Sequence, residues 1–319
     1  MHIPDGFLDI KTAVGTGILA AAVVIPTFVK LRVHPRTVPL IGLGAAFVFA
    51  AQMINFPVAK GTSGHLLGAT LMATVLGLPP AILIMTTVLV AQTFMFADGG
   101  VTALGANIIN MAIIAPTGGY FLAKKLRKIL GDPLGMYAGV CFGGWASTVA
   151  AAFACAAELK ISGTVKSNLV FPIMMGIHAI IGLGEGVISA LLVATLHRLF
   201  PHLLNLQEKP SQTPARHAIG FGFAAVIGLV IIGTPVACGW PDGLERVAHN
   251  FGFIEKASNK PIFPAPAQDY NIKLGDVNLG LLGTILAGVL GTLLVYGLSL
   301  FVATRLAHQT HYEKSNTHT

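Results

Sequence analysis

Long apolar runs with almost no charge recur along this chain of 319 residues. A helix needs about 20 apolar residues, within a range of about 17–25, to cross the hydrocarbon core of a bilayer. Only 10% of the residues are charged and the mean hydropathy is +0.75, whereas charged residues make up about 25% of a typical soluble domain. The pattern predicts an all-α integral membrane protein.

The apolar runs predict about seven transmembrane helices followed by a C-terminal two-helix hairpin. We expect spans near 11–30, 38–57, 64–78, 79–97, 103–123, 134–157 and 168–197, and hairpin helices near 217–236 and 277–303. The third run is short and meets the fourth at Gly77-Leu78-Pro79-Pro80. Interrupted segments are tolerated at membrane depth where they line a cavity enclosed by protein.

The spacing of the runs divides the chain into two domains. Residues 1–200 hold the first seven runs, and a polar, Pro-containing linker follows at 201–216. Residues 217–319 form the predicted hairpin, whose helices are separated by an extracytoplasmic loop at 237–276.

Lys and Arg in short loops indicate the orientation, because cytoplasmic loops carry the excess of positive charge. If the N-terminus is outside, twelve basic residues fall on the cytoplasmic side: Lys30, Arg32, Arg36, Lys124, Lys125, Arg127, Lys128, Arg198, Lys209, Arg216, Arg305 and Lys314. The short segments of the other side hold Lys11, Lys60, Lys160 and Lys166. The distribution predicts a multi-pass protein of the cell membrane (inner or plasma membrane) with its N-terminus extracytoplasmic and its C-terminus cytoplasmic.

The first residues, Met1-His2-Ile3-Pro4-Asp5-Gly6, are polar and acidic. A cleaved signal peptide starts with a basic region instead, so we expect the mature protein to keep Met1. The Met1 amine and the His2 backbone nitrogen would close a five-membered ring on a metal ion. The same backbone nitrogen and His2 Nδ1 would close a six-membered ring, giving three nitrogen donors in sequence.

Four nitrogen donors in a plane suit Ni(II) or Cu(II), and His65 is the candidate for the fourth. The peptide nitrogen must lose its proton to bind, so affinity should fall at acid pH. Ni(II) and Cu(II) displace such protons more readily than Co(II) or Zn(II), which favours nickel over cobalt. The alternative interpretation is a frayed terminus in which His2 merely follows the first residue.

His65 comes after Gly61-Thr62-Ser63-Gly64 and is expected to open a short helix beside an apolar run. In the predicted orientation it lies on the same outer side as His2, which favours a joint site. A lone histidine at such a position is also a common packing residue, and the spacing alone leaves both interpretations open.

Other polar residues stand in apolar surroundings. His178 and Glu185 lie seven residues apart in the predicted span 168–197 and share a helix face. Ionisable groups inside a membrane are usually paired or functional, so His178 is a candidate for a metal role, a structural hydrogen bond or a contact with another subunit. Asp98-Gly99-Gly100, Asn107 and Asn110 either support metal ligands through hydrogen bonds or cap a helix.

Several classes of function lack their motifs. The sequence has no G-x-x-x-x-G-K-[ST] phosphate loop, so active transport would need a separate ATPase. It also has no G-x-S-x-G and no H-E-x-x-H, which argues against a membrane hydrolase.

The three cysteines and the net charge indicate no further function. Cys141, Cys155 and Cys238 lack a C-x-x-C spacing and are expected to pack as apolar residues. The net charge of +7 sits in short loops and does not indicate a nucleic-acid partner.

Four segments together resemble the CbiM/NikM family, the substrate-specific components of energy-coupling factor (ECF) transporters for cobalt and nickel. They are MHIPDGF at 1–7, GTSGHLLGA at 61–69, DGGVTALGANIIN at 98–110 and HAIIGLGEGVISA at 178–190. The likeness spans about the first 200 residues, and the combination of Met-His with Ser-Gly-His is its most specific part. Further on, Pro241-Asp242-Gly243-Leu244-Glu245 resembles the PDGLE-type accessory component, so the whole chain is similar to a fused NikMN arrangement.

The resemblance implies a substrate-binding S component that imports Ni(II) or Co(II), the latter a metal of cobalamin biosynthesis. It implies Met1, His2 and His65 as the metal ligands and no catalytic residues. It also implies a transmembrane coupling (T) protein and cytoplasmic ATP-binding subunits as partners, within membrane lipid. The rival hypothesis is a proton-coupled secondary transporter or channel for a small solute, with His178 and Glu185 as its proton relay.

Overall fold

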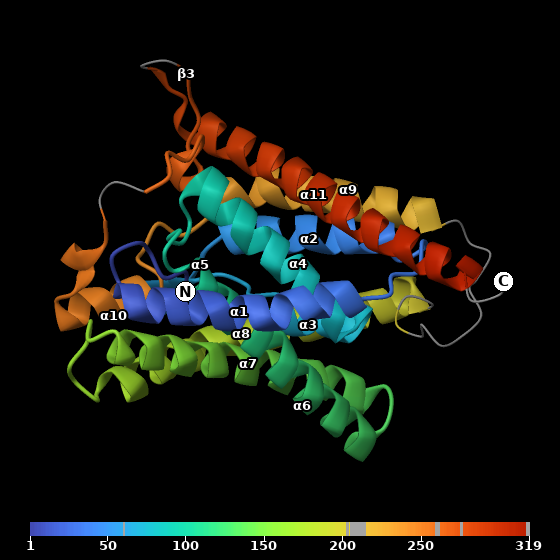
Figure 1. Ribbon diagram of the computed structural model, residues 1–319, viewed down its shortest axis with the longest axis horizontal. Coiled ribbons are helices and arrows are strands. Elements are labelled where there is room, and N and C mark those ends of the chain that lie inside the picture. The colour runs from blue at the N-terminus through green and yellow to red at the C-terminus, as the bar shows by residue number, and fades with distance from the viewer. Residues whose placement is uncertain (60, 202–203, 205–214, 259–261, 275–276, 317–319) are drawn as a thin grey trace.

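The chain folds into a bundle of long helices with two short β-hairpins (Figure 1). This computed structural model describes residues 1–59, 61–201, 204, 215–258, 262–274 and 277–316. The helices are α1 (Ile10–Lys30), α2 (Val38–Met53), α3 (Ala69–Leu76), α4 (Leu78–Ala91), α5 (Leu104–Asn107), α6 (Ala115–Leu130), α7 (Leu134–Ile161), α8 (Val170–Leu199), α9 (Ala215–Gly233), α10 (Gly243–Phe251) and α11 (Gly280–Asn316). The antiparallel strand pairs are β1 (Phe56–Ala59) with β2 (Thr62–Gly64), and β3 (Lys273–Leu274) with β4 (Val277–Asn278).

Seven helical stretches in the described part of the chain are long and apolar enough to cross a membrane, which confirms a multi-pass membrane protein. They are Ile10–Lys30, Leu78–Phe96, Leu104–Leu130, Leu134–Ile161, Val170–Leu199, Ile219–Val236 and Gly280–Ala307. The last two are the hairpin helices, so the first part holds five long spans and the shorter α2 of 16 residues. The predicted span 64–78 is wrong: it forms part of β2, a loop and the eight-residue α3, which is too short to cross.

Local chemistry explains the helix boundaries. The Asp9 carboxylate caps α1 by accepting from the backbone N–H groups of Lys11 and Thr12 at 3.3 and 3.2 Å. Gly77, with φ 91°, separates α3 from α4, as the sequence predicts for this interrupted segment. A π-helical turn, Gln92–Phe96, follows α4 and leads directly to Asp98.

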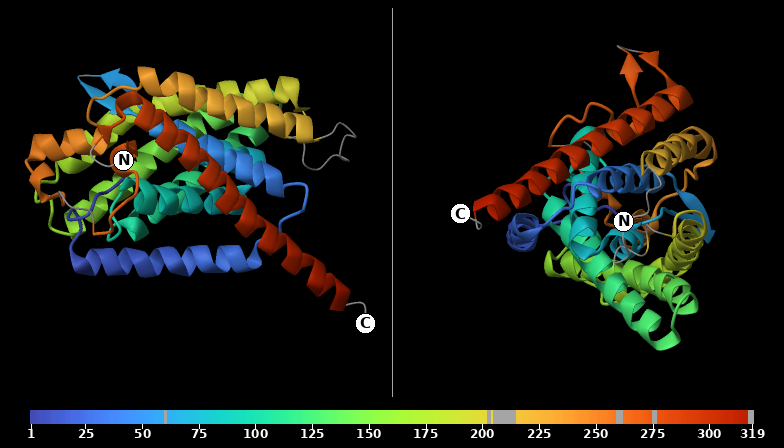
Figure 2. Two further views of the ribbon diagram at one scale, coloured as in Figure 1. Left: turned by 90° about the horizontal axis from the view of Figure 1, so that it is seen from above. Right: turned by 90° about the vertical axis from the view of Figure 1, so that its right-hand side faces the viewer.

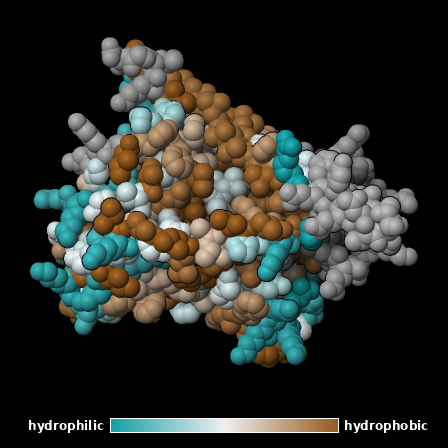
Figure 3. Space-filling view, viewed as in Figure 1, coloured by the Kyte–Doolittle hydropathy of each residue, from teal (hydrophilic) through white to brown (hydrophobic). Residues whose placement is uncertain are grey.

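Large apolar side chains are exposed on the outer helices of the bundle. Figure 3 shows hydrophobic atoms over the middle of one face and hydrophilic atoms gathered toward its ends. In helix α1, all of whose residues the structure describes, only Ala20 is buried. The side chains of Ile10, Ile18 and Val29 on this helix are more than half exposed. Such a surface suits the hydrocarbon core of a bilayer, where apolar side chains need no protein cover.

The hairpin helices pack against the first part of the chain. Helices α9 and α11 lie along α2, while α6, α7 and α8 pack in sequence on the other side (Figures 1 and 2). The loop that joins α9 to α11 contains α10, which contacts α8 and β2 at the end of the bundle where the N-terminus lies. The end of α11 at Asn316 lies at the opposite end of the long axis (Figures 1 and 2). Most of the predicted linker 201–216 falls outside the described residues.

Candidate metal centre

The N-terminal segment is buried and hydrogen-bonded. Met1, Ile3 and Phe7 are 6%, 0% and 1% exposed, and each buried apolar side chain of this size contributes about 1.5–3 kcal/mol. Ile3 N–H donates to Asn107 Oδ1 at 2.8 Å, and its carbonyl accepts from Asn107 Nδ2 at 3.1 Å and from Gly100 N–H at 2.8 Å. These contacts favour a fixed terminus over a frayed one.

Asp5 turns this segment back toward the bundle. One carboxylate oxygen accepts from both Thr102 N–H and Thr102 Oγ1, at 2.9 and 2.7 Å, and the Asp5 carbonyl accepts from Ser258 N–H at 2.8 Å. Gly100 permits the close approach, since a Cβ there would lie 2.2 Å from Asp5 N. The turn therefore depends on residues from three separate parts of the chain.

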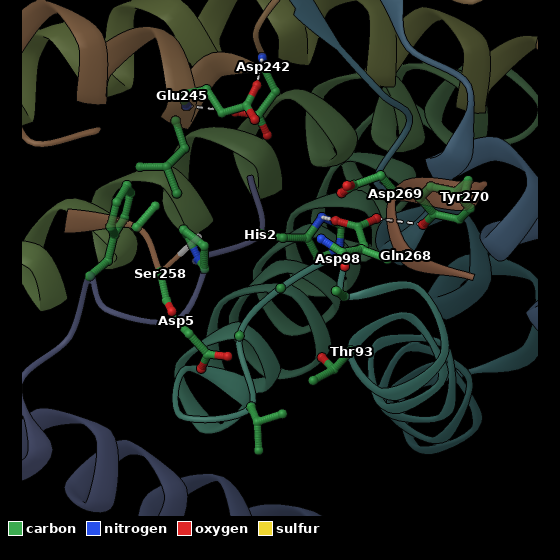
Figure 4. Close-up of a pocket in the computed structure, with 18 of the residues that line it drawn as sticks. His2, Asp5, Thr93, Asp98, Asp242, Glu245, Ser258, Gln268, Asp269 and Tyr270 are labelled. Atoms are coloured by element: carbon green, nitrogen blue, oxygen red, sulfur yellow. Dashed lines mark hydrogen bonds and ion pairs between the residues drawn. The ribbon is translucent and has the colours of Figure 1, made fainter. Parts of the chain in front are cut away.

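The three residues nominated from the sequence come together. The Met1 amine lies 3.3 Å from His65 Nε2, and the rings of His2 and His65 stack with centroids 5.4 Å apart and an interplanar angle of 26°. The amine also donates to Asp242 Oδ2 at 2.6 Å, so a carboxylate from the C-terminal loop reaches the same point. Figure 4 shows His2 and Asp242 at the cavity around these groups.

His65 lies in the loop between β2 and α3, not at a helix start as predicted. Its neighbours are held by Glu185 of α8, whose two carboxylate oxygens accept from Leu67 N–H at 2.6 Å and Gly68 N–H at 2.9 Å. Gly68 has φ 76°, a left-handed conformation that glycine adopts at little cost, and α3 starts at the next residue, Ala69. Glu185 thus fixes the loop that carries His65.

The His2 ring is engaged by Asp98. His2 Nδ1 lies 3.1 Å from Asp98 Oδ1, and Tyr270 donates its hydroxyl to Asp98 Oδ2 at 2.5 Å. Because a carboxylate only accepts, Nδ1 is the donor. His2 Nε2 is buried and has no hydrogen-bond partner among the described residues. Chelation through Nδ1 therefore requires the ring to turn, so that Nδ1 is released from Asp98 and Nε2 carries the remaining N–H.

The pKa of the Met1 amine and the pKa values of the two imidazoles shift in opposite directions. Burial lowers the pKa of the Met1 amine, but the charge and hydrogen bond of Asp242 outweigh it and raise that pKa above the ordinary 8.0. The same ammonium, opposed by burial, holds the pKa of the Asp242 carboxylate well below its usual range. Burial, the ammonium and His2 lower the pKa of His65 to about 3, and burial also lowers the pKa of His2. At neutral pH the amine is charged and both imidazoles are neutral.

A cavity of about 440 Å³ adjoins these groups. His2, His65 and Tyr270 line it together with a set of acidic side chains: Asp5, Asp98, Asp242, Glu245 and Asp269. Figure 4 labels these acidic residues and Tyr270 around the opening. Five acidic side chains thus line the cavity, and negative walls attract cations.

No group of three or more His, Cys, Asp or Glu side chains in the described ranges could hold a metal ion. The chelate predicted from the sequence differs from such a group, because it draws two of its donors from the main chain, the Met1 amine and the His2 backbone nitrogen. The only side-chain donors that the predicted chelate needs are the imidazoles of His2 and His65.

The remaining polar candidates have structural partners. His178 Nδ1 lies 2.8 Å from the Met174 carbonyl, which agrees with the structural role among its predicted alternatives. Asn110 donates to Glu158 Oε2 at 2.7 Å, while Asn107 holds Ile3. The three cysteines are free thiols. With both oxygens of Glu185 bonded to backbone, these contacts do not favour the proton-relay hypothesis.

Sequence reasoning missed Asp242 and Tyr270. They lie 241 residues from Met1 and 172 residues from Asp98 respectively, and spacing cannot reveal such contacts. One signal existed: Pro-Asp-Gly occurs at both 4–6 and 241–243, and the aspartates of both turns line the same cavity.

Comparison with known proteins identifies the family. The model for the cobalt uptake substrate-specific transmembrane region, CbiM, matches residues 2–203. The chain belongs to this family. The PDGLE domain model matches residues 216–308, and the CbiM match includes His2 and His65 while the PDGLE match includes Asp242.

Relatives share both parts. The putative fused nickel transport protein NikMN of Archaeoglobus fulgidus is 34% identical over 299 residues, which cover 90% of this chain and 95% of the relative. The probable fused nickel transport protein LarMN of Lactiplantibacillus plantarum is 30% identical over 322 residues, covering 93% and 97%. The fold is also similar to a crystal structure of a transition metal transporter. The match covers 62% of this chain and 93% of that chain, with 33% sequence identity and a TM-score of 0.57.

Proposed function

We propose that this CbiM-family chain is the substrate-binding membrane component of an ATP-driven ECF transporter that imports a divalent transition metal. The observation that carries the proposal is the meeting of the Met1 amine with His65 Nε2 at 3.3 Å, next to the His2 ring. Two nitrogens that bind one metal at about 2.0 Å each and at a right angle are about 2.8 Å apart. A small approach of amine and imidazole therefore suffices for both to bind one ion.

The proposed ligands are the Met1 amine, the His2 backbone nitrogen, His2 Nδ1 and His65 Nε2. Neutral imidazoles are ready to bind, whereas the amine and the peptide nitrogen must release protons. Four nitrogens in a plane, one of them a deprotonated peptide nitrogen, favour Ni(II) over Co(II). Relatives carry both metals in their names, including a putative cobalt transport protein CbiM of Methanococcus voltae.

The proposed transport direction follows the charge pattern and the fold. The metal site and the acidic cavity lie at the N-terminal end of the bundle, which we assign to the extracytoplasmic side. The basic C-terminal end then faces the cytoplasm, where a T protein and ATP-binding subunits would act. We assign residues 1–200 to the metal-binding domain, 201–216 to a cytoplasmic linker and 217–319 to the accessory domain with its outer loop 237–276.

Radiolabelled nickel uptake tests the proposal in cells that express the full transporter. A short N-terminal extension and the His2→Ala variant should each abolish uptake, because each removes donors from the chelate. The same extension placed at the C-terminus, which lies at the opposite end of the molecule, should leave uptake intact. Normal uptake by a protein whose N-terminal extension is verified by mass spectrometry would overturn the mechanism.

A further inference from the structure

We propose that the C-terminal domain completes the metal site through two positioning residues, Asp242 at the Met1 amine and Tyr270 behind Asp98 and His2. The inference rests on the proposed function and goes beyond it. It assigns to the outer loop of the second domain the task of holding the donors that the first domain supplies.

Asp242 is fixed before it meets the amine. As the N-cap of α10 it accepts from Glu245 N–H at 2.8 Å through Oδ1, and Glu245 in return accepts from Asp242 N–H at 2.9 Å. The turn that carries it docks on β2, where Ser63 N–H and Oγ donate to the carbonyls of Pro241 and Trp240 at 2.9 and 2.7 Å. Ser63 lies two residues before His65, so one short strand places both the imidazole and the carboxylate.

The Asp242 contact is compatible with a bound metal. A coordinated amine gives its lone pair to the ion and keeps two N–H groups. One of these can continue to donate to Asp242 Oδ2, now 2.6 Å from the nitrogen. Hydrogen bonds of this kind orient metal ligands and strengthen them as donors.

Tyr270 positions His2 indirectly, by holding Asp98. Its ring stacks on Phe96 with centroids 4.7 Å apart and an interplanar angle of 16°, and its hydroxyl holds the Asp98 carboxylate at 2.5 Å. Both Asp269 and Tyr270 have positive φ values, 53° and 55°, which cost free energy in non-glycine residues. The packing and the hydrogen bond maintain this conformation. When the His2 ring turns to bind metal through Nδ1, its Nε2–H becomes the donor for the carboxylate that Tyr270 fixes.

Charge supports the same arrangement. A divalent ion bound to a neutral amine, two neutral imidazoles and one deprotonated peptide nitrogen carries a net charge of about +1, because only the peptide nitrogen adds a negative charge. Such a cation in a buried site needs nearby negative charge. Asp98 and Asp242 supply it from opposite sides without replacing a nitrogen ligand.

The test is nickel binding to the purified full-length protein, measured by calorimetry and by the visible absorption of the bound Ni(II). Asp242→Asn keeps the helix cap, because Asn is as good an N-cap residue as Asp. With its single amide oxygen on Glu245 N–H, however, Asn cannot accept from the amine. Tyr270→Phe removes only the hydroxyl. The matched controls are Glu255→Gln, which removes an exposed carboxylate charge from the same outer loop, and Tyr296→Phe in α11.

The Asp242→Asn variant should bind Ni(II) about 10–100-fold more weakly and Tyr270→Phe about 10-fold more weakly, and each should shift the absorption of the bound ion. The controls should stay within about 2-fold. All metal-free variants should still unfold cooperatively, with a lower thermal midpoint for Asp242→Asn because the buried ammonium loses its charged partner. If wild type binds nickel and both variants bind it equally well with an unchanged spectrum, the inference is wrong while the proposed function stands. If wild type binds no nickel, the proposed function fails and the inference with it.

Discussion

The Met1 amine and the imidazoles of His2 and His65 differ in protonation before a metal arrives. Asp242 keeps the amine charged, since its charge and hydrogen bond raise the amine pKa above 8.0 despite burial. Burial lowers the pKa of both imidazoles below 6.5. For the proposed chelate, the protons that compete with the metal near neutral pH are therefore those of the amine and of the His2 peptide nitrogen.

This gives a pH dependence with a defined sign. Between about pH 6.5 and 8 each bound metal should release two protons, so the dissociation constant should fall about 100-fold for each unit of pH. Above the raised pKa of the amine only the peptide proton remains, and the dependence should weaken to about 10-fold per unit. Nickel titrations in a series of buffers measure it, and an affinity independent of pH would contradict the proposed donor set.

At the residue scale the three donors can be predicted from the sequence, but not what surrounds them. Met1, His2 and His65 are predictable because free-amine chelation is local chemistry that residue order reveals. The structure brings the three together, while metal binding by them remains a prediction. Asp242 and Tyr270 could not be predicted, because their contacts depend on how the second domain docks on the first.

Helix α8 and the loop before α3 form the element that determines where His65 lies. Glu185, 1% exposed, accepts from two backbone N–H groups of this loop. Hydrogen bonds to a buried carboxylate are worth more than neutral ones. The sequence makes Glu185 a candidate for a proton relay, whereas in the structure it holds the loop that carries His65.

Glu185→Ala should destabilise the protein by about 1–3 kcal/mol for each buried N–H that it leaves without a partner. It should also weaken nickel binding, because the His65 loop would no longer be held. Thermal unfolding in detergent and nickel calorimetry measure the two effects. Glu255→Gln in the outer loop is the control, and a Glu185→Ala protein that matches it in both measurements would show that the clamp is unimportant.

Among the helices, the long spans could be predicted and the irregular segments could not. Apolar length alone predicts α1, α7, α8 and the hairpin helices, since a bilayer requires it. The run at 64–78 is equally apolar, but Gly64 and Gly68 and the pairing of β1 with β2 convert its first half into strand and loop. Tertiary hydrogen bonds from α8 and the Trp240–Pro241 turn stabilise that conformation, and no local pattern encodes them.

On the scale of the whole molecule, both parts of the chain contribute to the proposed metal site. The first part contributes the proposed nitrogen donors, from its terminus and from the loop after β2. In the second part, α9 and α11 pack along α2. Its outer loop reaches the proposed donors, where Asp242 contacts the Met1 amine and Tyr270 contacts Asp98. The N-terminus and the end of α11 lie at opposite ends of the bundle (Figure 2), so we expect the site and the basic end of α11 to face opposite sides of the membrane.

A crystal structure of the nickel-loaded protein tests the central claim most directly. We predict one ion in a near-planar site formed by the Met1 amine, the His2 backbone nitrogen, His2 Nδ1 and His65 Nε2, each about 2 Å away. Outside the coordination sphere, Asp242 should still accept from the amine, and Asp98 should accept from His2 Nε2–H. An ion held instead by the carboxylates of the cavity, with the Met1 amine still paired to Asp242, would contradict the account.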